Sequence, residues 1–266
     1  MVKHRVIKKP LRVILKNKPL IEAIFELRWE LKEIPPGMKI DPHYKLLIGR
    51  LYDRMNKDYP YYEELATATM PDGLAEHIVQ HRFRKSKDGW PLVQLGPGII
   101  TLNDTDSYVW EDFGRRIGQT VRSLFQAYPD SSDNLKVNRI MLRYIDAVDY
   151  DFGKDYIFEF LRDKLKTELI LSSNLFRDTG VSESPLAFDM RFAFSSTKPK
   201  GVIRLRFVRG QRKNIDALIW ETMVESSSDD AFKNQSDISN WIKKAHELTD
   251  DWFFKLIEGD LQRRFE

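Results

Sequence analysis

Arginines alternate with apolar residues along three segments of the chain that are predicted to be β-strands. Alternation at period two puts the arginines on one face of each strand and the apolar side chains on the other. A planar guanidinium can hold a phosphate through two parallel hydrogen bonds, so an arginine-lined sheet face is a candidate site for phosphate or single-stranded RNA. This candidate binding face consists of Arg82, Arg84, Arg191, Arg204 and Arg206.

Carboxylates on the predicted strands support a different interpretation of these arginines. The acids are as numerous as the arginines, and cross-strand pairs of opposite charge stabilise antiparallel sheets. Most aromatic residues fall on the apolar side of the strands, which gives little support to base stacking. On sequence alone both interpretations stay open. The acids available for pairing are Glu22, Glu26, Glu30, Asp189, Glu221 and Glu225.

The N-terminus is the second candidate site, because residues 1–18 contain seven Lys or Arg and no acid. The whole chain carries +3, so the remaining residues sum to −4 and create no general positive field for nucleic acid. A basic arm at residues 1–16 could contact phosphates or an acidic partner; the alternative is a solvated terminus. Its candidate contacts are Lys3, Arg5, Lys8, Lys9 and Arg12.

The residue patterns of familiar catalytic, cofactor and metal sites are absent from the sequence. There is no cysteine, which excludes disulfides and thiolate chemistry. There is no P-loop, no dinucleotide-binding glycine motif and no G-x-S-x-G motif. His77 and His81 are four positions apart on a predicted strand, roughly 13 Å along it, which is too far for one metal ion. We therefore predict no catalytic residues, no cofactor and no metal.

Similar strand and helix patterns in the two parts of the chain must position these residues. An alternating apolar strand at 21–31 has a counterpart at 137–148. Later in each part, an amphipathic helix carries a tryptophan in its first turns, Trp110 in one and Trp241 in the other. The repeated pattern predicts two copies of one structural unit.

Turn-forming residues at 129–134 mark the boundary between a first half, 17–132, and a second half, 133–266. Each half has the predicted order β-α-β-β(-β)-α. Short connections make neighbouring strands antiparallel, and the helices pack on one face. The predicted fold class is therefore α+β. The halves form either two domains or, if they pair edge to edge, one curved sheet with an open face.

Three local patterns give finer predictions. Asp41 followed by Pro42 predicts the N-cap and the first position of a helix. Residues 76–84 predict a second strand. Residues 90–103 predict either an edge strand or two short strands, because proline in the middle of a strand belongs at an edge or a bulge.

The location expected from the sequence is the cytoplasm. No apolar run approaches the roughly 20 residues that a membrane-spanning helix needs, and the basic N-terminus is not followed by the apolar region of a signal peptide. Hydrophobic residues make up 42% of the chain, enough for a packed core.

Three segments together resemble a sporadically distributed family of bacterial proteins of about this length. They are NKPLIEAIFELRW at 17–29, WPLVQLGPG at 90–98 and YVWEDF at 108–113. The resemblance covers essentially the whole chain and is clearest at 17–125. The family has no assigned function and brings no site residues. Its patchy distribution implies accessory genes, such as phage-defence or toxin–antitoxin loci.

These observations favour a non-catalytic binding protein of the bacterial cytoplasm. It would hold a protein partner, encoded nearby, through a face or an edge of the sheet, because strand pairing needs only backbone groups and side-chain pockets. The alternative is a nucleic-acid-binding or nucleotide-sensing module that uses the sheet arginines and the basic arm. An enzyme of unrecognised type is the second alternative.

Overall fold

The computed structural model describes residues 15–105, 107–129, 135–227 and 235–266. The strands are β1 (Leu20–Trp29), β2 (Lys32–Ile34), β3 (Met38–Ile40), β4 (Tyr61–Glu64), β5 (His81–Arg84), β6 (Leu92–Gly96), β7 (Ile99–Asp104), β8 (Val137–Asp149), β9 (Asp189–Thr197), β10 (Lys200–Arg212) and β11 (Ile215–Ser227). The α-helices are α1 (Tyr44–Met55), α2 (Trp110–Ala127), α3 (Ile157–Leu165), α4 (Gln235–Ile257) and α5 (Asp260–Phe265).

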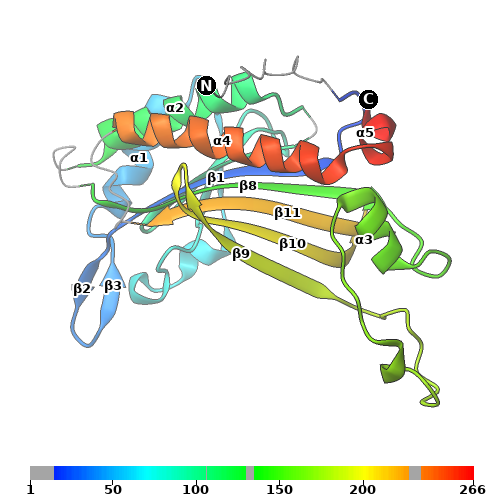
Figure 1. The fold of residues 1–266 in the computed structure, drawn as a ribbon. Helices are drawn as coiled ribbons and strands as arrows, with labels where there is room; N and C mark the ends of the chain where they lie inside the picture. Colours follow the sequence, from blue (N-terminus) through cyan, green and yellow to red (C-terminus); the bar gives the residue numbers. More distant parts are fainter. Residues whose placement is uncertain (1–14, 106, 130–134, 228–234) are drawn as a thin grey trace, which may run out of the picture.

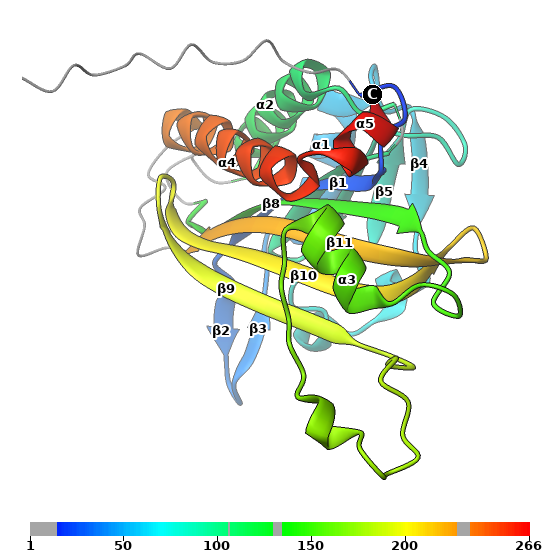
Figure 2. The same ribbon diagram turned by 45° about the vertical axis from the view of Figure 1, so that its right-hand side comes forward.

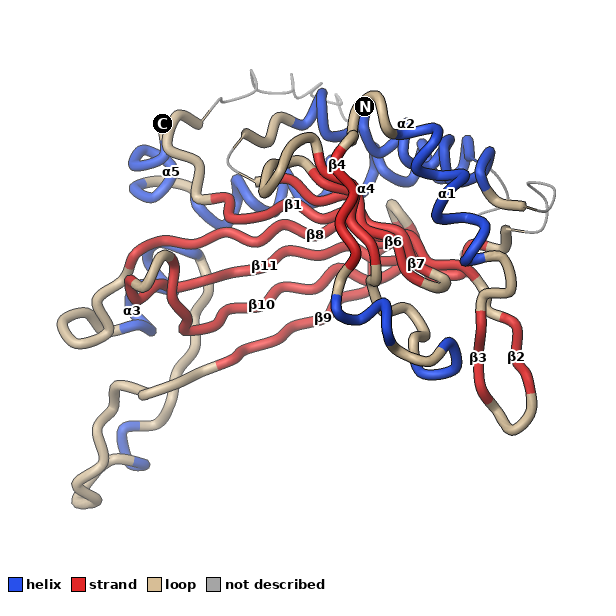
Figure 3. Tube along the Cα trace, turned by 180° about the vertical axis from the view of Figure 1, so that it is seen from behind, coloured by secondary structure: helices blue, strands red, loops and turns tan. Residues whose placement is uncertain are grey.

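Nine of these strands form a single antiparallel sheet in the order β4-β5-β6-β7-β1-β8-β11-β10-β9, and β2 and β3 form a separate hairpin. The long helices α2 and α4 lie along one face of the sheet (Figure 1). Seen from behind, strands β4, β5, β6 and β7 run steeply across the direction of β8, β11, β10 and β9 (Figure 3). The sheet is therefore strongly twisted. The predicted α+β class, with antiparallel strands and helices on one face, is confirmed.

The two parts of the chain meet at the centre of the sheet, where β1 pairs with β7 on one side and β8 on the other. Phe25 lies opposite Leu142 and Leu27 lies opposite Ile140. Both strands alternate at period two, so this register places all four apolar side chains on the helix-covered face. The two halves therefore share one continuous sheet, which is one of the arrangements that the sequence left open.

Strand order is the same in both halves when it is followed outward from this centre. In the first half β1 is followed by β7, β6 and β5; in the second, β8 is followed by β11, β10 and β9. In the sequence of each half, a helix lies between the central strand and the outer strands, α1 in one and α3 in the other, and a long helix follows the last strand, α2 in one and α4 in the other. The shared order accounts for the repeated sequence pattern. The internal duplication itself stays a prediction.

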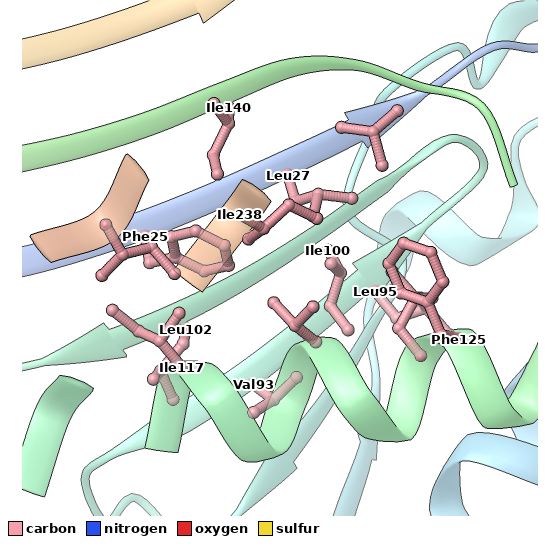
Figure 4. Close-up of a cluster of buried hydrophobic side chains, with 14 of the residues drawn as sticks. Phe25, Leu27, Val93, Leu95, Ile100, Leu102, Ile117, Phe125, Ile140 and Ile238 are labelled. Atoms are coloured by element: carbon pink, nitrogen blue, oxygen red, sulfur yellow. The ribbon is translucent and has the colours of Figure 1, made fainter. Parts of the chain in front are cut away.

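The core lies between the sheet and the helices and consists of two neighbouring clusters. In the larger one, Phe25 and Leu27 of β1 pack with Ile117 of α2 and Ile238 of α4 (Figure 4). The smaller cluster joins α3, α5 and the end of α4 to the outer part of β8, β10 and β11, around Trp220. Figure 2 shows α3 in front of this end of the sheet.

Two local predictions need correction, and one alternative is decided. The N-cap of α1 is His43, because Asp41 instead forms a turn in which its Oδ1 accepts from the His43 N–H at 3.0 Å. The strand predicted at 76–84 begins only at His81, since His77 has a positive φ of 54°. Residues 90–103 form two strands, β6 and β7, which make an interior hairpin.

The shared sheet predicts that damage at the centre weakens both halves together. Phe25 is fully buried, so Phe25→Ala should lower the free energy of unfolding by about 3–5 kcal/mol. Native-state hydrogen exchange should show equal losses of protection in β6 and β11. Leu186→Ala, at a side chain that is 90% exposed, is the control and should change neither. Loss of protection confined to β6 would contradict a single cooperative sheet.

Candidate functional site

The three predicted arginines of the second half come together on the open face of the sheet. Arg206 Nε lies 2.8 Å from Asp189 Oδ1, and its Nη1 lies 2.8 Å from Glu221 Oε1. Arg191 Nη2 lies 2.7 Å from Asp189 Oδ2. Hydrogen bonds from Arg206 and Arg191 hold the pKa of the Asp189 carboxyl well below its usual range. The third arginine, Arg204, lies beside them on β10 and is also paired with a carboxylate.

Glutamates of β11 each bridge arginines of the strands on both sides. Glu225 lies 2.6 Å from Arg204 Nη1 on β10 and 2.5 Å from Arg139 Nη2 on β8. Glu221, which pairs with β10 as described above, also lies 2.7 Å from Arg143 Nη2 on β8. This arrangement is the cross-strand pairing that the sequence offered as the alternative to phosphate binding.

The two predicted arginines of the first half lie on a different part of the sheet. Arg84 Nε lies 2.9 Å from Glu63 Oε2, and Arg82 Nη1 lies 3.8 Å from Glu63 Oε1. Their strand, β5, is six positions away from β10 in the sheet order, roughly 29 Å at the usual strand spacing. The five arginines therefore do not form one site, and the predicted single binding face is divided into two groups.

The ion pairs reduce what these arginines offer to a ligand, because a phosphate would have to displace a carboxylate from each of them. A binding role for Arg82, Arg84, Arg191, Arg204 and Arg206 stays a prediction. The candidate contacts of the basic arm, Lys3, Arg5, Lys8, Lys9 and Arg12, lie outside the described residues.

A second surface is formed by the segment between α3 and β9, residues 168–188, which we call the α3–β9 loop. It extends away from the body of the molecule and leads directly into β9, the strand at one edge of the sheet (Figures 1 and 2). Several of its apolar side chains are largely exposed. They are Ile170 (79% exposed), Leu171, Leu175, Val181 and Leu186 (90% exposed).

A third feature is a pocket of about 460 Å³ between the helices and the sheet. The sheet supplies Tyr144 and Asp146 from β8 and Thr222 from β11. Helices α2 and α4, together with the segment that leads into β1, supply the other walls. The remaining lining residues are Leu15, Lys18, Pro19, Leu20, Tyr108, Val109, Trp110, Glu111, His246, Thr249, Asp250, Phe253 and Phe254.

Asp146 is the chemically unusual residue of this pocket. Its side chain belongs to a residue that is only 3% exposed, and no described residue forms a hydrogen bond or an ion pair with its carboxyl group. Burial raises the pKa of this carboxyl to about 8, so the group is mostly protonated at neutral pH. A register shift in β1 between Leu20 and Glu22 lies beside it, as expected for an irregularity near a site.

Thr222 adds a second polar group to the same wall. Its hydroxyl is buried and has no hydrogen-bond partner among the described residues. Tyr144, the cross-strand partner of Thr222, lies on the same wall, where its OH is 3.0 Å from Tyr108 OH and 3.2 Å from His246 Nδ1. Burial raises the Tyr144 pKa well above its usual value. The His246 ring stacks on Trp110 at 3.6 Å between centroids. These contacts tie the sheet to Tyr108 and to α4, while Asp146 and Thr222 keep hydrogen-bonding groups that no described residue uses.

The chemistry of this pocket is that of binding. Aromatic and aliphatic walls with a few convergent polar groups are typical of small-molecule sites, whose volumes usually range from about 300 to 1,000 Å³. A neutral carboxyl can donate a hydrogen bond, and an ionised one can accept several. A buried carboxyl without a partner is unfavourable in the free protein, so a ligand that satisfies it gains affinity.

Sequence reasoning did not identify this pocket, although one signal was available. On β8 the apolar face runs through Ile140, Leu142 and Tyr144, and Asp146 is the next residue with the same phase. Thr222 likewise falls between Trp220 and Val224 on the buried face of β11. A charged residue in the apolar phase of a central strand is therefore the pattern that predicts such a site.

Neither metal ligands nor membrane helices are found in the part of the chain that the structure describes. No three His, Asp or Glu side chains there are grouped so that they could hold a metal ion. None of the helices there has the length and apolar character needed to cross a bilayer.

No protein-family model matches the chain, and no curated protein matches it at a significant level. The resemblance carried by residues 17–29, 90–98 and 108–113 therefore stays a prediction, and the function must be argued from the molecule itself.

The buried carboxyl predicts a specific dependence of stability on pH. The folded protein holds Asp146 protonated up to about pH 8, whereas the unfolded chain ionises it near pH 4, so stability should fall as pH rises from 4 to 8. Asp146→Asn removes this loss. Its stability relative to the wild type should therefore increase across this range, by on the order of 3–5 kcal/mol.

Urea unfolding at pH 5, 7 and 9, followed by tryptophan fluorescence, measures this difference. Asp155→Asn, which removes an exposed carboxylate, is the matched control and should show no comparable trend. A constant difference between wild type and Asp146→Asn at all three pH values would show that Asp146 is ionised in the folded protein.

Proposed function

We propose that this protein is a non-catalytic binding protein that holds a protein partner through the α3–β9 loop and the edge strand β9. The observation that carries the proposal is the exposure of the apolar side chains of this loop, led by Ile170 and Leu186. Apolar side chains that stay in water on a projecting loop do not stabilise the fold through burial. Clusters of exposed apolar residues mark interaction surfaces.

The adjoining edge strand supports the same role. β9 has β10 on one side only, so its outer backbone groups are available for pairing with another strand. Natural edge strands are usually protected by charges or proline. β9 carries Asp189 and Arg191 at its start, whereas its remaining residues, 192–197, contain neither. Phe192 and Phe194 are 38% and 48% exposed on this strand. An extended segment of a partner could pair with β9 and cover both rings.

The ion pairs on the open face favour the edge over the face as the docking surface. A partner on the face would meet guanidinium groups that are already satisfied by carboxylates, such as Arg206 between Asp189 and Glu221. A partner at the edge would meet unpaired backbone groups and exposed apolar side chains. We propose, as the sequence suggested, that the protein holds this partner in the cytoplasm and does not catalyse a reaction.

Substitutions in the loop test the proposal. A double variant, Ile170→Ser with Leu186→Ser, should lose a partner that co-purifies at one-to-one stoichiometry with the tagged wild-type chain. The matched control is Leu46→Ser, because Leu46 on α1 is also largely exposed, at 64%, but lies outside the proposed surface. We expect at least a tenfold drop in recovered partner for the double variant, in keeping with apolar anchors at interface hot spots.

Two outcomes would contradict the proposal. One is equal recovery of the partner by the double variant and by the wild type. The other is the absence of any stoichiometric protein in the wild-type preparation together with a monomer in light scattering. A dimer of the chain that is broken by the double variant would instead identify the partner as a second copy.

A further inference from the structure

We propose that the pocket between the sheet and helices α2 and α4 binds a small organic cation, an amine or amidine with an apolar body, whose N–H groups are held by Asp146 and Thr222. This site is separate from the proposed docking surface, because none of its lining residues belongs to the α3–β9 loop or to β9. The inference therefore goes beyond the proposed function and does not depend on it.

The side chains of Asp146 and Thr222 are buried in the pocket wall with unsatisfied hydrogen-bonding groups. Asp146 and Thr222 are 3% and 2% exposed, both line the pocket, and neither side chain has a hydrogen-bond partner among the described residues. On the open face of the same sheet, by contrast, Asp189, Glu221 and Glu225 are each paired with arginines. Other buried polar atoms of β8 and β11 also lack a hydrogen-bond partner among the described residues, such as Asn138 Oδ1 and Trp220 Nε1, but neither of those residues lines the pocket.

The charged residues that line the pocket bear on the sign of its ligand. Three carboxylate residues line the pocket, Glu111, Asp146 and Asp250, against one lysine, Lys18. The Lys18 ammonium donates to the backbone carbonyl of Tyr108 at 2.6 Å and so is already engaged. Glu111 and Asp250 also have interactions of their own within the protein, so the group open to a ligand is Asp146, whose ionised form attracts a cation and repels an anion. The titratable groups around the pocket are Lys18, Tyr108, Glu111, Tyr144, Asp146, His246 and Asp250.

The walls of the pocket are rich in aromatic side chains. Tyr108, Trp110, Phe253 and Phe254 surround the pocket with aromatic rings. Aromatic faces accept both apolar groups and organic cations, and the attraction for a cation increases when water is excluded. The volume of about 460 Å³ suits a ligand with one or two rings. A hydrated metal ion would leave most of this apolar surface unused.

Binding of such a ligand should be coupled to release of a proton. Without ligand the Asp146 carboxyl is mostly protonated at pH 7, since its pKa is raised to about 8 by burial. A cation beside it favours the carboxylate, so the proton leaves to solvent and the ligand N–H groups donate to the oxygens. We expect about one proton to be released per ligand at pH 6 to 7.

Calorimetry with benzamidine as the probe tests the site in the full-length protein. Titrations in two buffers of different ionisation enthalpy give both the affinity and the number of protons released. Benzamide has the same shape without the charge and is the ligand control. For a probe of this size we expect saturable binding with a Kd of about 1 mM or tighter, and benzamide should bind at least about tenfold more weakly.

Three variants assign the effect to the residues. Asp146→Asn should weaken benzamidine binding by about tenfold or more and abolish proton release, and Thr222→Val should weaken it by about threefold. Asp155→Asn, at an exposed carboxylate, should leave both quantities unchanged. The proposal is overturned if benzamidine does not bind, if benzamide binds equally well, or if Asp146→Asn binds benzamidine like the wild type.

Discussion

The pairing of β1 with β8 is the constraint on which the rest of the structure depends. It joins the two halves into one sheet and fixes which side chains of each strand face the helices. The same register sends Leu142 into the core, Asp146 into the pocket and Arg143 to the open face. A slip by one residue would exchange these faces, so the core, the pocket and the ion pairs all require this one alignment.

The open face and the helix-covered face differ in how their polar groups are satisfied. On the open face, carboxylates such as Glu221 and Glu225 each bridge arginines of two neighbouring strands. The side chains of Glu221 and Glu225 are only 14% and 15% exposed, so the pairing compensates for their desolvation and leaves few unpaired charges for a ligand. On the covered face, Asp146 and Thr222 are buried, and neither side chain has a hydrogen-bond partner among the described residues. We therefore propose that recognition takes place away from the arginines, in the pocket and at the β9 edge.

Much of the fold could be predicted from residue patterns, because period two and amphipathic helices are local properties. The strand at 137–148 and the helix near Trp110 follow from such patterns. Long-range arrangement could not be predicted in the same way. Whether Arg84 and Arg204 share a site depends on the order of strands in the sheet, and that order is set by packing between distant segments.

The candidate sites, too, could be predicted only in part from the sequence. Cross-strand pairing of the arginines could be foreseen, since the acids on the strands were as numerous as the arginines. The pocket could not be located, because its walls come from five separate segments of the chain. Even so, Asp146 in the apolar phase of β8 was a visible departure from the pattern. The exposure of Leu186 and Ile170 depends on the path of the α3–β9 loop, which no periodicity describes.

We propose that a partner protein docks at the α3–β9 loop and the β9 edge. Hydrogen exchange measured on the purified complex and on the free chain tests it most directly, because strand pairing slows exchange of the amides involved. If the partner docks there, exchange should become slower in residues 168–197 on complex formation, with no change in β5 and β6. Protection that appears in β4 and β5 and leaves residues 168–197 unchanged would contradict it.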